Sequence, residues 1–324
     1  MLDCIVIGAG QAGLAVGYYL RKKGLNFVIL DAESGPGAAW RHTWPSLTLF
    51  SNSASSNLPG WPMPHHEGFP PASHVIDYFA RYEKRYELPI RRPVRVDEVT
   101  HDGACFHVFA GTEHLTARTV VAATGTWSAP FIPYYPGDFG GQQWHSAFYP
   151  GPEDFAGSTV AVVGAANSGA QIAAELLLSG VETTWYTRSS PRWMPDDVDG
   201  RVLFQRNRAR LNAMLRGEPD PGADSNLGDI VMVPPVLRAR DSGLLQATPM
   251  FSSLDEVNTD HLIWCTGFRP ALRPIRGLLA GTSPAVDGLF LVGYGTWTGP
   301  GSATITGVSP FARQTAQAVA NICD

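Results

Sequence analysis

The chain has 324 residues, a hydrophobic content of 44% and a formal net charge of −5 at pH 7. Its length suits about two domains, and its weak negative charge provides no basic field for nucleic acid. Because no apolar run approaches the roughly 20 residues of a membrane span, and the first predicted strand begins almost at Met1, we expect no membrane anchor or secretory leader. We therefore expect a cytoplasmic protein without nucleic-acid or membrane partners, and a homodimer is left open.

The first predicted element is a buried strand at residues 4–7 that runs into a glycine-rich turn and then a helix. Glycines in this pattern let the backbone turn sharply and approach a pyrophosphate, while the helix N-terminus points its amides at the phosphates. A second strand ends in Asp31, the acid that would hold a ribose hydroxyl. The alternative is a glycine turn without a ligand. The candidate cofactor contacts in the turn are Gly8, Gly10, Gln11, Ala12 and Gly13.

A related pattern follows a strand at residues 160–163, although Ala166 replaces its middle glycine. The chain therefore predicts two dinucleotide sites. The next strand, residues 183–187, runs into Arg188 and Ser189, which suit the extra phosphate of NADPH better than an acid would. NADH remains an accepted alternative, and Arg188 could instead be a solvated residue at a strand end. The candidate contacts in the second turn are Gly164, Asn167, Ser168 and Gly169.

Two further strands, residues 120–123 and 262–265, resemble each other because each ends in Thr-Gly with an aromatic residue close behind. Proline-rich segments flank the second glycine motif and suggest that the chain crosses between domains there. We predict an α/β fold with two Rossmann-like domains of the glutathione reductase and thioredoxin reductase type, the second inserted in the first. The first domain would comprise residues 1–149 and 267–324, and the second residues 150–266. The Thr-Gly pairs add Thr124, Gly125, Thr266 and Gly267 as candidate cofactor contacts.

The C-terminal part contains a predicted strand at residues 289–292, a turn beginning at Gly293, and a helix at residues 308–322. Gly293 is a candidate cofactor contact because a helix N-terminus behind such a turn could face a flavin. An ordinary strand-to-helix turn is an equal alternative. The four cysteines include no Cys-x-x-Cys pair, which argues against a redox dithiol. The histidines and cysteines do not fall into metal-ligand spacing, so no metal is predicted.

Several motifs together resemble the short bacterial flavin-containing monooxygenases, which are class B flavoproteins. Residues 37–44, Gly-Ala-Ala-Trp-Arg-His-Thr-Trp, are similar to the family's Gly-Gly-x-Trp segment, and residues 46–51 and 58–64 resemble the short bacterial group in particular. Residues 139–149 match the signature Phe-x-Gly-x-x-x-His followed by an aromatic residue. The resemblance adds Trp40, Arg41 and His42 to the candidate cofactor contacts.

This resemblance implies that FAD accepts a hydride from NADPH and then reacts with O₂ to form a C4a-(hydro)peroxyflavin. The intermediate would oxygenate a small organic sulfide or amine, and could oxidise ketones by a Baeyer-Villiger reaction. Two alternatives stay open: a flavin-dependent oxidoreductase or oxidase whose electron acceptor is not oxygenated, and a nucleotide-sensing flavoprotein without turnover.

Three residues are candidates for the catalytic region. Many family members place an asparagine beside the flavin, and Phe50 takes that place here. Asn57 could substitute for it, although a turn residue in a Ser/Asn-rich loop is the favoured interpretation. We hypothesise that Phe50 leaves the intermediate less protected, and equal oxygen coupling in a Phe50→Asn variant would contradict this. His145 ends the monooxygenase signature, with a linker histidine bonded to backbone as the alternative.

Overall fold

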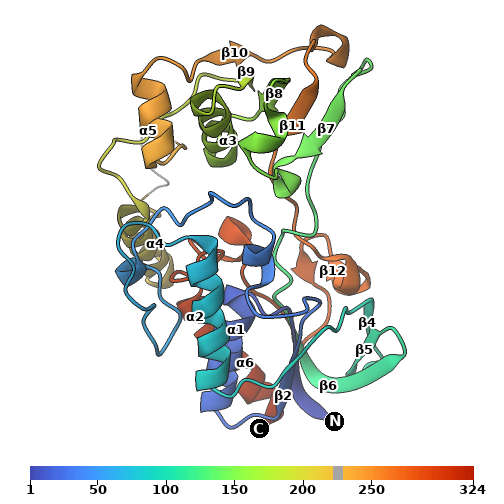
Figure 1. Ribbon diagram of the computed structural model, residues 1–324. Helices are drawn as coiled ribbons and strands as arrows, with labels where there is room; N and C mark the ends of the chain where they lie inside the picture. The colour runs from blue at the N-terminus through green and yellow to red at the C-terminus, as the bar shows by residue number, and fades with distance from the viewer. Residues whose placement is uncertain (222–228) are drawn as a thin grey trace.

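A computed structural model describes residues 1–221 and 229–324, and it consists of two units that each contain a parallel sheet (Figure 1). The first sheet has seven strands in the order β3-β2-β1-β6-β5-β4, with β14 also paired to β6. β1 lies between β2 and β6 in parallel pairing, whereas β4, β5 and β6 form an antiparallel extension. The strands are β1 (Leu2–Ile7), β2 (Phe27–Leu30), β3 (Ile90–Arg91), β4 (Glu98–His101), β5 (Phe106–Ala110), β6 (Glu113–Ala122) and β14 (Leu289–Leu291).

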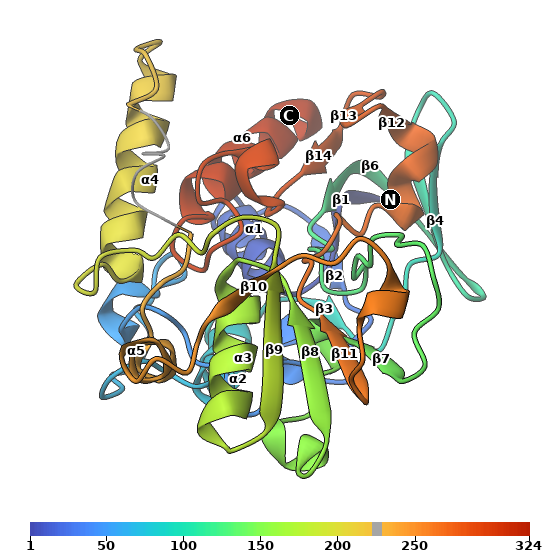
Figure 2. The ribbon, with the colours of Figure 1, turned by 90° about the horizontal axis from the view of Figure 1, so that it is seen from above.

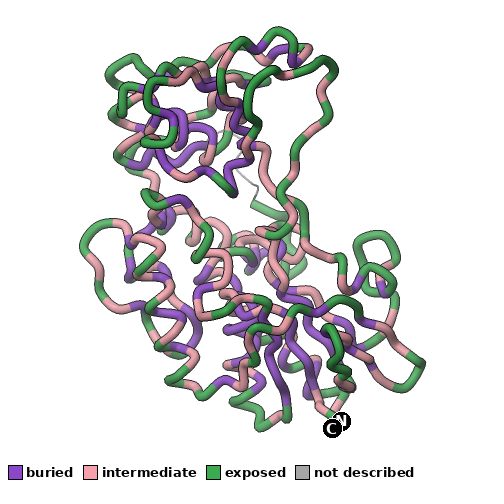
Figure 3. Tube along the Cα trace, turned by 45° about the vertical axis from the view of Figure 1, so that its right-hand side comes forward, coloured by how far each residue is buried: buried purple, intermediate pink, exposed green. Residues whose placement is uncertain are grey.

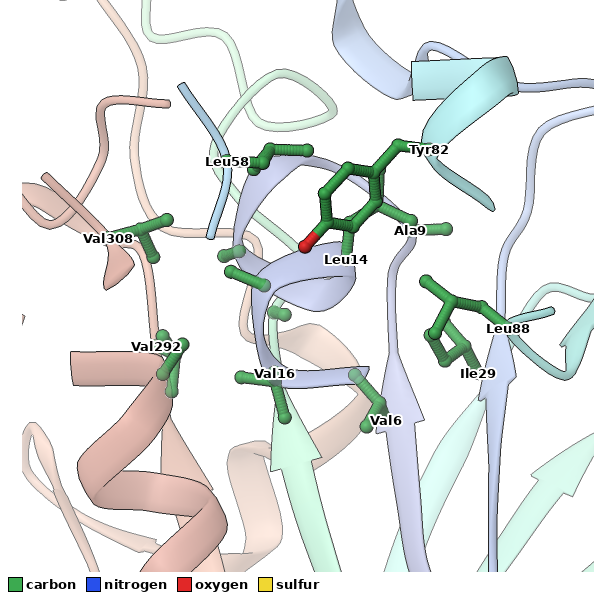
Figure 4. Packing of buried hydrophobic residues seen from close by; sticks show 14 of the residues in the cluster. Val6, Ala9, Leu14, Val16, Ile29, Leu58, Tyr82, Leu88, Val292 and Val308 are labelled. Carbon is green, nitrogen blue, oxygen red and sulfur yellow. The ribbon is translucent and has the colours of Figure 1, made fainter. Parts of the chain in front are cut away.

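Helices cover one face of this sheet. α1 (Gln11–Lys22) and α6 (Ser309–Cys323) pack against each other and the strands, and α2 (Ala72–Arg85) lies on the outside of α1. Strands β1 and β2 are buried along most of their lengths, as expected for parallel strands covered on both faces. Figure 4 shows Leu14 and Val16 of α1 among Val6, Ile29 and Tyr82 in this core.

The second sheet is entirely parallel, in the order β10-β9-β8-β11-β7. α3 (Asn167–Leu178) and α5 (Pro234–Asp241) cover one face, and Figure 2 shows α3 alongside β9 and β8. Aromatic side chains such as Phe251 and Trp264 fill the other face. The strands are β7 (Gln142–His145), β8 (Thr159–Val163), β9 (Glu182–Thr187), β10 (Ala247–Pro249) and β11 (His261–Trp264).

The two units exchange segments. β7 pairs with β11 in the second sheet although it precedes residue 150, so this sheet begins earlier than the predicted insertion. α4 (Gly200–Leu215) follows the second glycine motif in sequence, yet its Leu211 is buried in the core of the first unit. In the other direction, Trp44 and Phe50 from the first part of the chain pack into the core of the second unit.

Figure 3 shows buried segments inside both units, with more exposed chain between them. Several short elements complete the chain. Among the described helices, none is both long and apolar enough to cross a bilayer. A short antiparallel pair joins β12 (Leu279–Ala280) to β13 (Ser283–Pro284). The 3₁₀ helices are Ala38–Arg41, Ser53–Ser55, Ser146–Phe148, Pro152–Phe155, Leu254–Glu256, Arg273–Leu278 and Gly295–Thr298.

Candidate functional site

The first glycine turn lines a cavity of about 820 Å³ at the carboxyl ends of β1, β2 and β6. Ligand pockets in proteins span about 300–1,000 Å³, so this cavity has room for a large cofactor. Open parallel sheets bind ligands at this edge, where strand order reverses. Among the predicted contacts, those on its wall are Gly8, Gly10, Gln11, Ala12, Asp31, Thr124, Gly125 and Gly293.

Glycine is required in this turn by a left-handed backbone conformation at Gly8 and by close approach of backbone atoms at Gly8 and Gly13. Gly8 has a φ of +101°, and a Cβ there would lie 2.5 Å from the Ala123 carbonyl oxygen. A Cβ on Gly13 would lie 1.9 Å from the Gly8 carbonyl oxygen. Gly13 is buried in α1 and does not line the cavity, so its direct role is close packing of the helix. Gly10 is the N-cap residue of α1 and has no side chain that could accept hydrogen bonds from the first amides of the helix. Those amides therefore remain available to a phosphate.

Asp31 is held by a buried ion pair at the edge of the cavity. Its Oδ2 accepts a hydrogen bond of 2.5 Å from Arg92 Nε, and the remaining guanidinium nitrogens donate to both oxygens of Glu83 at 2.8 Å. The side chains of Asp31, Arg92 and Glu83 are only 6%, 12% and 11% exposed. Burial raises the pKa of the Glu83 carboxyl, although Arg92 opposes this. Arg92 thereby fixes the acid predicted to bind ribose.

The three residues suggested by the Gly-Gly-x-Trp segment lie behind the cavity wall. Trp40 packs against the first core. The Arg41 guanidinium donates to Ser34 Oγ at 3.2 Å, and His42 Nε2 lies 2.8 Å from Glu33 Oε1. Of this group, Glu33 itself lines the cavity. Trp40, Arg41 and His42 therefore support the wall through Glu33 and the core, and none of the three reaches the cavity surface.

Thr124 and Gly293 both line the cavity, and Thr124 contacts Tyr294, the residue after Gly293. Thr124 Oγ1 donates to the Ala271 carbonyl at 2.8 Å and lies 2.7 Å from the Tyr294 hydroxyl. Gly293 has a φ of +90°, and a Cβ there would lie 2.6 Å from the Ala12 Cβ. The Thr124–Gly125 pair and the turn at Gly293 thus line the same cavity as the first glycine motif.

The second glycine turn repeats this geometry on β8 and α3. A Cβ on Gly164 would lie 2.4 Å from the Cys265 carbonyl oxygen, and one on Gly169 would lie 2.1 Å from the Gly164 carbonyl oxygen. Asn167 turns its side chain away from the helix end: Nδ2 donates to the Asp229 carbonyl and Oδ1 accepts from Val231 N at 2.8 Å. It therefore anchors a neighbouring segment.

Ser168 lies in the first turn of α3, whereas the predicted phosphate contacts Arg188 and Ser189 follow the end of β9. Burial raises the pKa of the Cys265 thiol to about 12, and the Ser168 side chain opposes this rise. Arg188 and Ser189 are exposed at the end of β9. The Arg188 guanidinium donates to the Tyr135 hydroxyl at 3.0 Å and lies 5.9 Å from the centre of the Tyr135 ring. Tyr135 thus holds Arg188 beside the predicted NADPH edge.

Thr266 and Gly267 lie where the chain returns from the second unit to the first. Thr266 Oγ1 donates to the Phe131 carbonyl, and the Gly267 carbonyl accepts from Phe131 N at 3.0 Å. Neither Thr266 nor Gly267 lines the cavity, so their place in the structure is at the crossing between units.

His145 joins the same crossing. Its side chain is buried, Nδ1 accepts a hydrogen bond from Ala147 N at 3.1 Å, and Nε2 lies 3.0 Å from the Gly267 carbonyl. Since Nδ1 accepts, the proton must be on Nε2, and the ring is a neutral donor to Gly267. Burial lowers the pKa of His145 below its ordinary value. The geometry matches the linker alternative, a histidine bonded to backbone.

We expect this histidine to make stability depend on pH. Because its folded pKa is lowered, its contribution is present above the unfolded pKa, about 6.5, and is lost as the pH falls through the folded pKa. His145→Gln should therefore lose less stability than the unmodified chain between pH 7.5 and pH 5.5. Urea unfolding at both pH values measures this, and equal losses would contradict the prediction.

Phe50 and Asn57 occupy the loop between the units. The Phe50 carbonyl accepts from Gly200 N at 2.7 Å, and its ring lies 6.3 Å from that of Phe204 in α4. Asn57 Oδ1 accepts from Met63 N and Nδ2 donates to the Ala54 carbonyl, at 2.8 and 2.7 Å. The Asn57 amide thus holds its own loop, as the turn interpretation expects, and neither residue lines the cavity.

Sequence reasoning missed the groups that contact site residues from distant positions in the chain. Arg92 lies 61 positions after Asp31, and Tyr294 lies 170 positions after Thr124. Neither partner follows from a spacing rule. The one available signal was the proximity of Gly293, a predicted contact, to Tyr294.

Comparison with known proteins agrees with this geometry. Residues 5–287 match the model of the family described as pyridine nucleotide-disulphide oxidoreductase. A solved flavin-containing monooxygenase from Stenotrophomonas maltophilia is 44% identical, with a TM-score of 0.87 over 100% of this chain and 99% of that one.

Two curated relatives are more distant. The oxidoreductase CzcO of Bacillus subtilis is 31% identical over 95% of this chain and 96% of its own length. The indole-3-pyruvate monooxygenase YUCCA1 of Oryza sativa is 30% identical over 62% of this chain and 51% of its length. Flavin monooxygenases use FAD and NADPH, and the α1 N-terminus without a side-chain cap, the glycine turn and the acid of the cavity fit FAD. The chain therefore belongs to the pyridine nucleotide-disulphide oxidoreductase family and is an oxidoreductase of the flavin-containing monooxygenase type.

Proposed function

We propose that the protein transfers one oxygen atom from O₂ to a small soft nucleophile, a sulfide or an amine, and to reactive ketones in Baeyer-Villiger fashion. For a sulfide, NADPH, a proton, O₂ and the sulfide would give NADP⁺, water and the sulfoxide. The observation that carries this proposal is a cofactor-sized cavity in a chain whose four cysteines are all free thiols. Burial raises the pKa of Cys4 and of Cys265 to about 12, so both stay protonated and inert. These two buried thiols are therefore poor candidates for a dithiol relay to a disulfide substrate.

We assign the cofactors to the two glycine turns. FAD, when bound, would accept a hydride from NADPH and supply the oxygen chemistry. The first turn and the end of α1 would bind its pyrophosphate, while Asp31, oriented by Arg92, would bind its ribose. The end of α3 would bind the NADPH pyrophosphate. The Phe50 loop, packed against Gly200, would exclude water between the units.

Arg188 tests the NADPH assignment. Arg188→Ala should raise the KM for NADPH by about 10- to 100-fold and leave that for NADH nearly unchanged, because a guanidinium–phosphate contact contributes about 1.5–3 kcal/mol. Tyr135→Phe is the matched control, since it removes the hydroxyl that holds Arg188 but keeps the aromatic ring at position 135 and the positive charge of Arg188. Steady-state kinetics with both nucleotides measure the change. An equal effect on NADPH and NADH would discard the assignment.

The reaction itself is tested with methyl p-tolyl sulfide. The purified yellow protein should consume NADPH in air and form sulfoxide in proportion, with peroxide measured in the same sample. Peroxide without sulfoxide would indicate an oxidase or an unprotected intermediate. A flavin that NADPH cannot bleach without oxygen would indicate a nucleotide sensor.

A further inference from the structure

The β4–β5 hairpin carries a cluster of metal-type donors that the proposed reaction does not use. Within the described part of the chain, Asp102, Cys105 and His107 each present one donor atom, and all three atoms lie within 4.8 Å of one another. The donors follow the pattern Asp-x-x-Cys-x-His, and they meet because His101 pairs with Phe106 and closes the turn between them. Figure 1 shows this hairpin at the edge of the first sheet, away from the second unit.

Two of the three distances between these donors are close to those of a tetrahedral site. Cys105 Sγ lies 3.8 Å from His107 Nε2, which lies 2.9 Å from Asp102 Oδ2. Zinc bonds of about 2.3 Å to sulfur and about 2.0–2.2 Å to nitrogen and oxygen imply edges of roughly 3.6 Å and 3.4 Å. The sulfur–nitrogen edge is thus nearly formed. The distance between His107 Nε2 and Asp102 Oδ2 needs to increase by about 0.5 Å when an ion replaces the proton that now lies between these two atoms.

The other nitrogen of His107 has a partner suited to a metal ligand. His107 Nδ1 lies 2.9 Å from His114 Nε2, and the His114 ring stacks on Phe109 with centroids 4.7 Å apart. When His107 donates through Nδ1, its Nε2 lone pair is available to an ion. A metal-bound histidine commonly has its second nitrogen fixed in this way. His114 therefore orients His107.

The carboxylate of Asp102 is also oriented. Its Oδ1 accepts from the backbone nitrogens of Ala104 and Cys105 at 2.8 and 2.9 Å, which leaves Oδ2 directed toward His107. The side chains of His107 and Asp102 are 24% and 50% exposed, so an ion can enter from solvent and keep a water ligand. A thiolate, an imidazole and a carboxylate favour a borderline transition-metal ion, since Mg²⁺ and Ca²⁺ prefer oxygen ligands.

We propose that the β4–β5 hairpin binds one divalent ion of the zinc class through Cys105 Sγ, His107 Nε2 and Asp102 Oδ2, with His114 positioning His107. Binding would release the thiol proton of Cys105, and His107 would move its own proton to Nδ1. The bound ion would join the turn to β5 and mask the Cys105 thiol. This site is separate from the cofactor cavity, since it shares no lining residue with it.

Equilibrium dialysis of the chelator-treated holoenzyme against ZnCl₂, with excess Mg²⁺ present, tests the site. Metal analysis should find one tightly bound zinc per chain. Cys105→Ser and His107→Gln should each weaken binding at least about 100-fold, and His114→Gln by about tenfold. Cys323→Ser, which removes another half-buried thiol, is the matched control and should bind like the unmodified chain. Equal zinc affinity in Cys105→Ser and the unmodified chain would overturn the proposal.

A second measurement needs no variant. Iodoacetamide labelling of the holoenzyme, followed by peptide mass spectrometry, should show that Zn²⁺ slows alkylation of Cys105 strongly and leaves Cys323 unaffected. Mg²⁺ at the same concentration should protect neither thiol. Alkylation of Cys105 at the same rate with and without Zn²⁺ would refute the site, even if the variants failed to fold.

Discussion

Replacing Gly10 by alanine is expected to give a folded protein that has lost most of its affinity for FAD. A Cβ at Gly10 would have the Ala38 Cβ, 3.5 Å away, as its nearest neighbour, which is an ordinary contact. The protein itself therefore tolerates the methyl group. Gly10 lines the cavity and caps α1, so the methyl group would hold the pyrophosphate away from the helix amides. Losing two hydrogen bonds of about 1.4 kcal/mol each corresponds to about 100-fold in affinity.

Two other glycines separate this effect from backbone strain. Gly24→Ala is the control, because Gly24 has a φ of +71° and open space around it. It should cost some stability and keep FAD. Gly8→Ala should damage the fold as well as binding, since its Cβ would collide with Ala123. Flavin titration of each apoprotein and urea unfolding measure the two effects. Unchanged FAD affinity in a folded Gly10→Ala protein would show that the pyrophosphate does not pass Gly10.

Arg92→Met should lower the free energy of unfolding by about 3–5 kcal/mol, because it leaves two buried carboxylates without their cation. Asp31 and Glu83 both lose charge-assisted hydrogen bonds, while methionine retains much of the apolar stem. The neighbouring Arg91→Met is the matched control. Arg91 pairs with Glu113, and both side chains are over 40% exposed, so less than about 1 kcal/mol should be lost. Urea unfolding of both variants at pH 8 measures the difference.

The pH dependence of this penalty identifies its cause. Burial already raises the pKa of Glu83, and removing Arg92 removes the group that opposes this rise. A carboxyl whose folded pKa is raised stabilises the fold below its unfolded pKa, and this contribution is lost as the pH rises through the folded value. The cost of Arg92→Met should therefore be smaller at pH 5 than at pH 8. A penalty independent of pH would indicate lost packing rather than unpaired charge.

Local patterns predicted much of the architecture because they are set by neighbouring residues. The α/β fold with parallel sheets is confirmed. The helix expected at residues 308–322 is observed as Ser309–Cys323. Glycine spacing identified both tight turns. Each turn lies so close to the end of an adjacent strand that a Cβ on Gly8 or Gly164 would collide with its backbone, so only glycine fits there. The family resemblance and the cofactors are likewise confirmed.

The remaining features depend on contacts between distant segments. The sequence contains nothing that links Arg92 to Asp31 or the Gly267 carbonyl to His145. The predicted insertion starting at residue 150 omits β7, because a four-residue strand with polar ends has little periodicity of its own. The hairpin donors Asp102, Cys105 and His107 converge only through a turn geometry that spacing rules for zinc sites do not include.

The exchange of segments between the units bears on how the protein unfolds. An excised fragment of residues 150–266 would lack Trp44 and Phe50, which fill its core, and would expose Leu211 of α4, which is buried in the other unit. Neither sheet could then complete its packing alone. The two halves should therefore melt in one cooperative transition, despite the two-domain appearance of the chain.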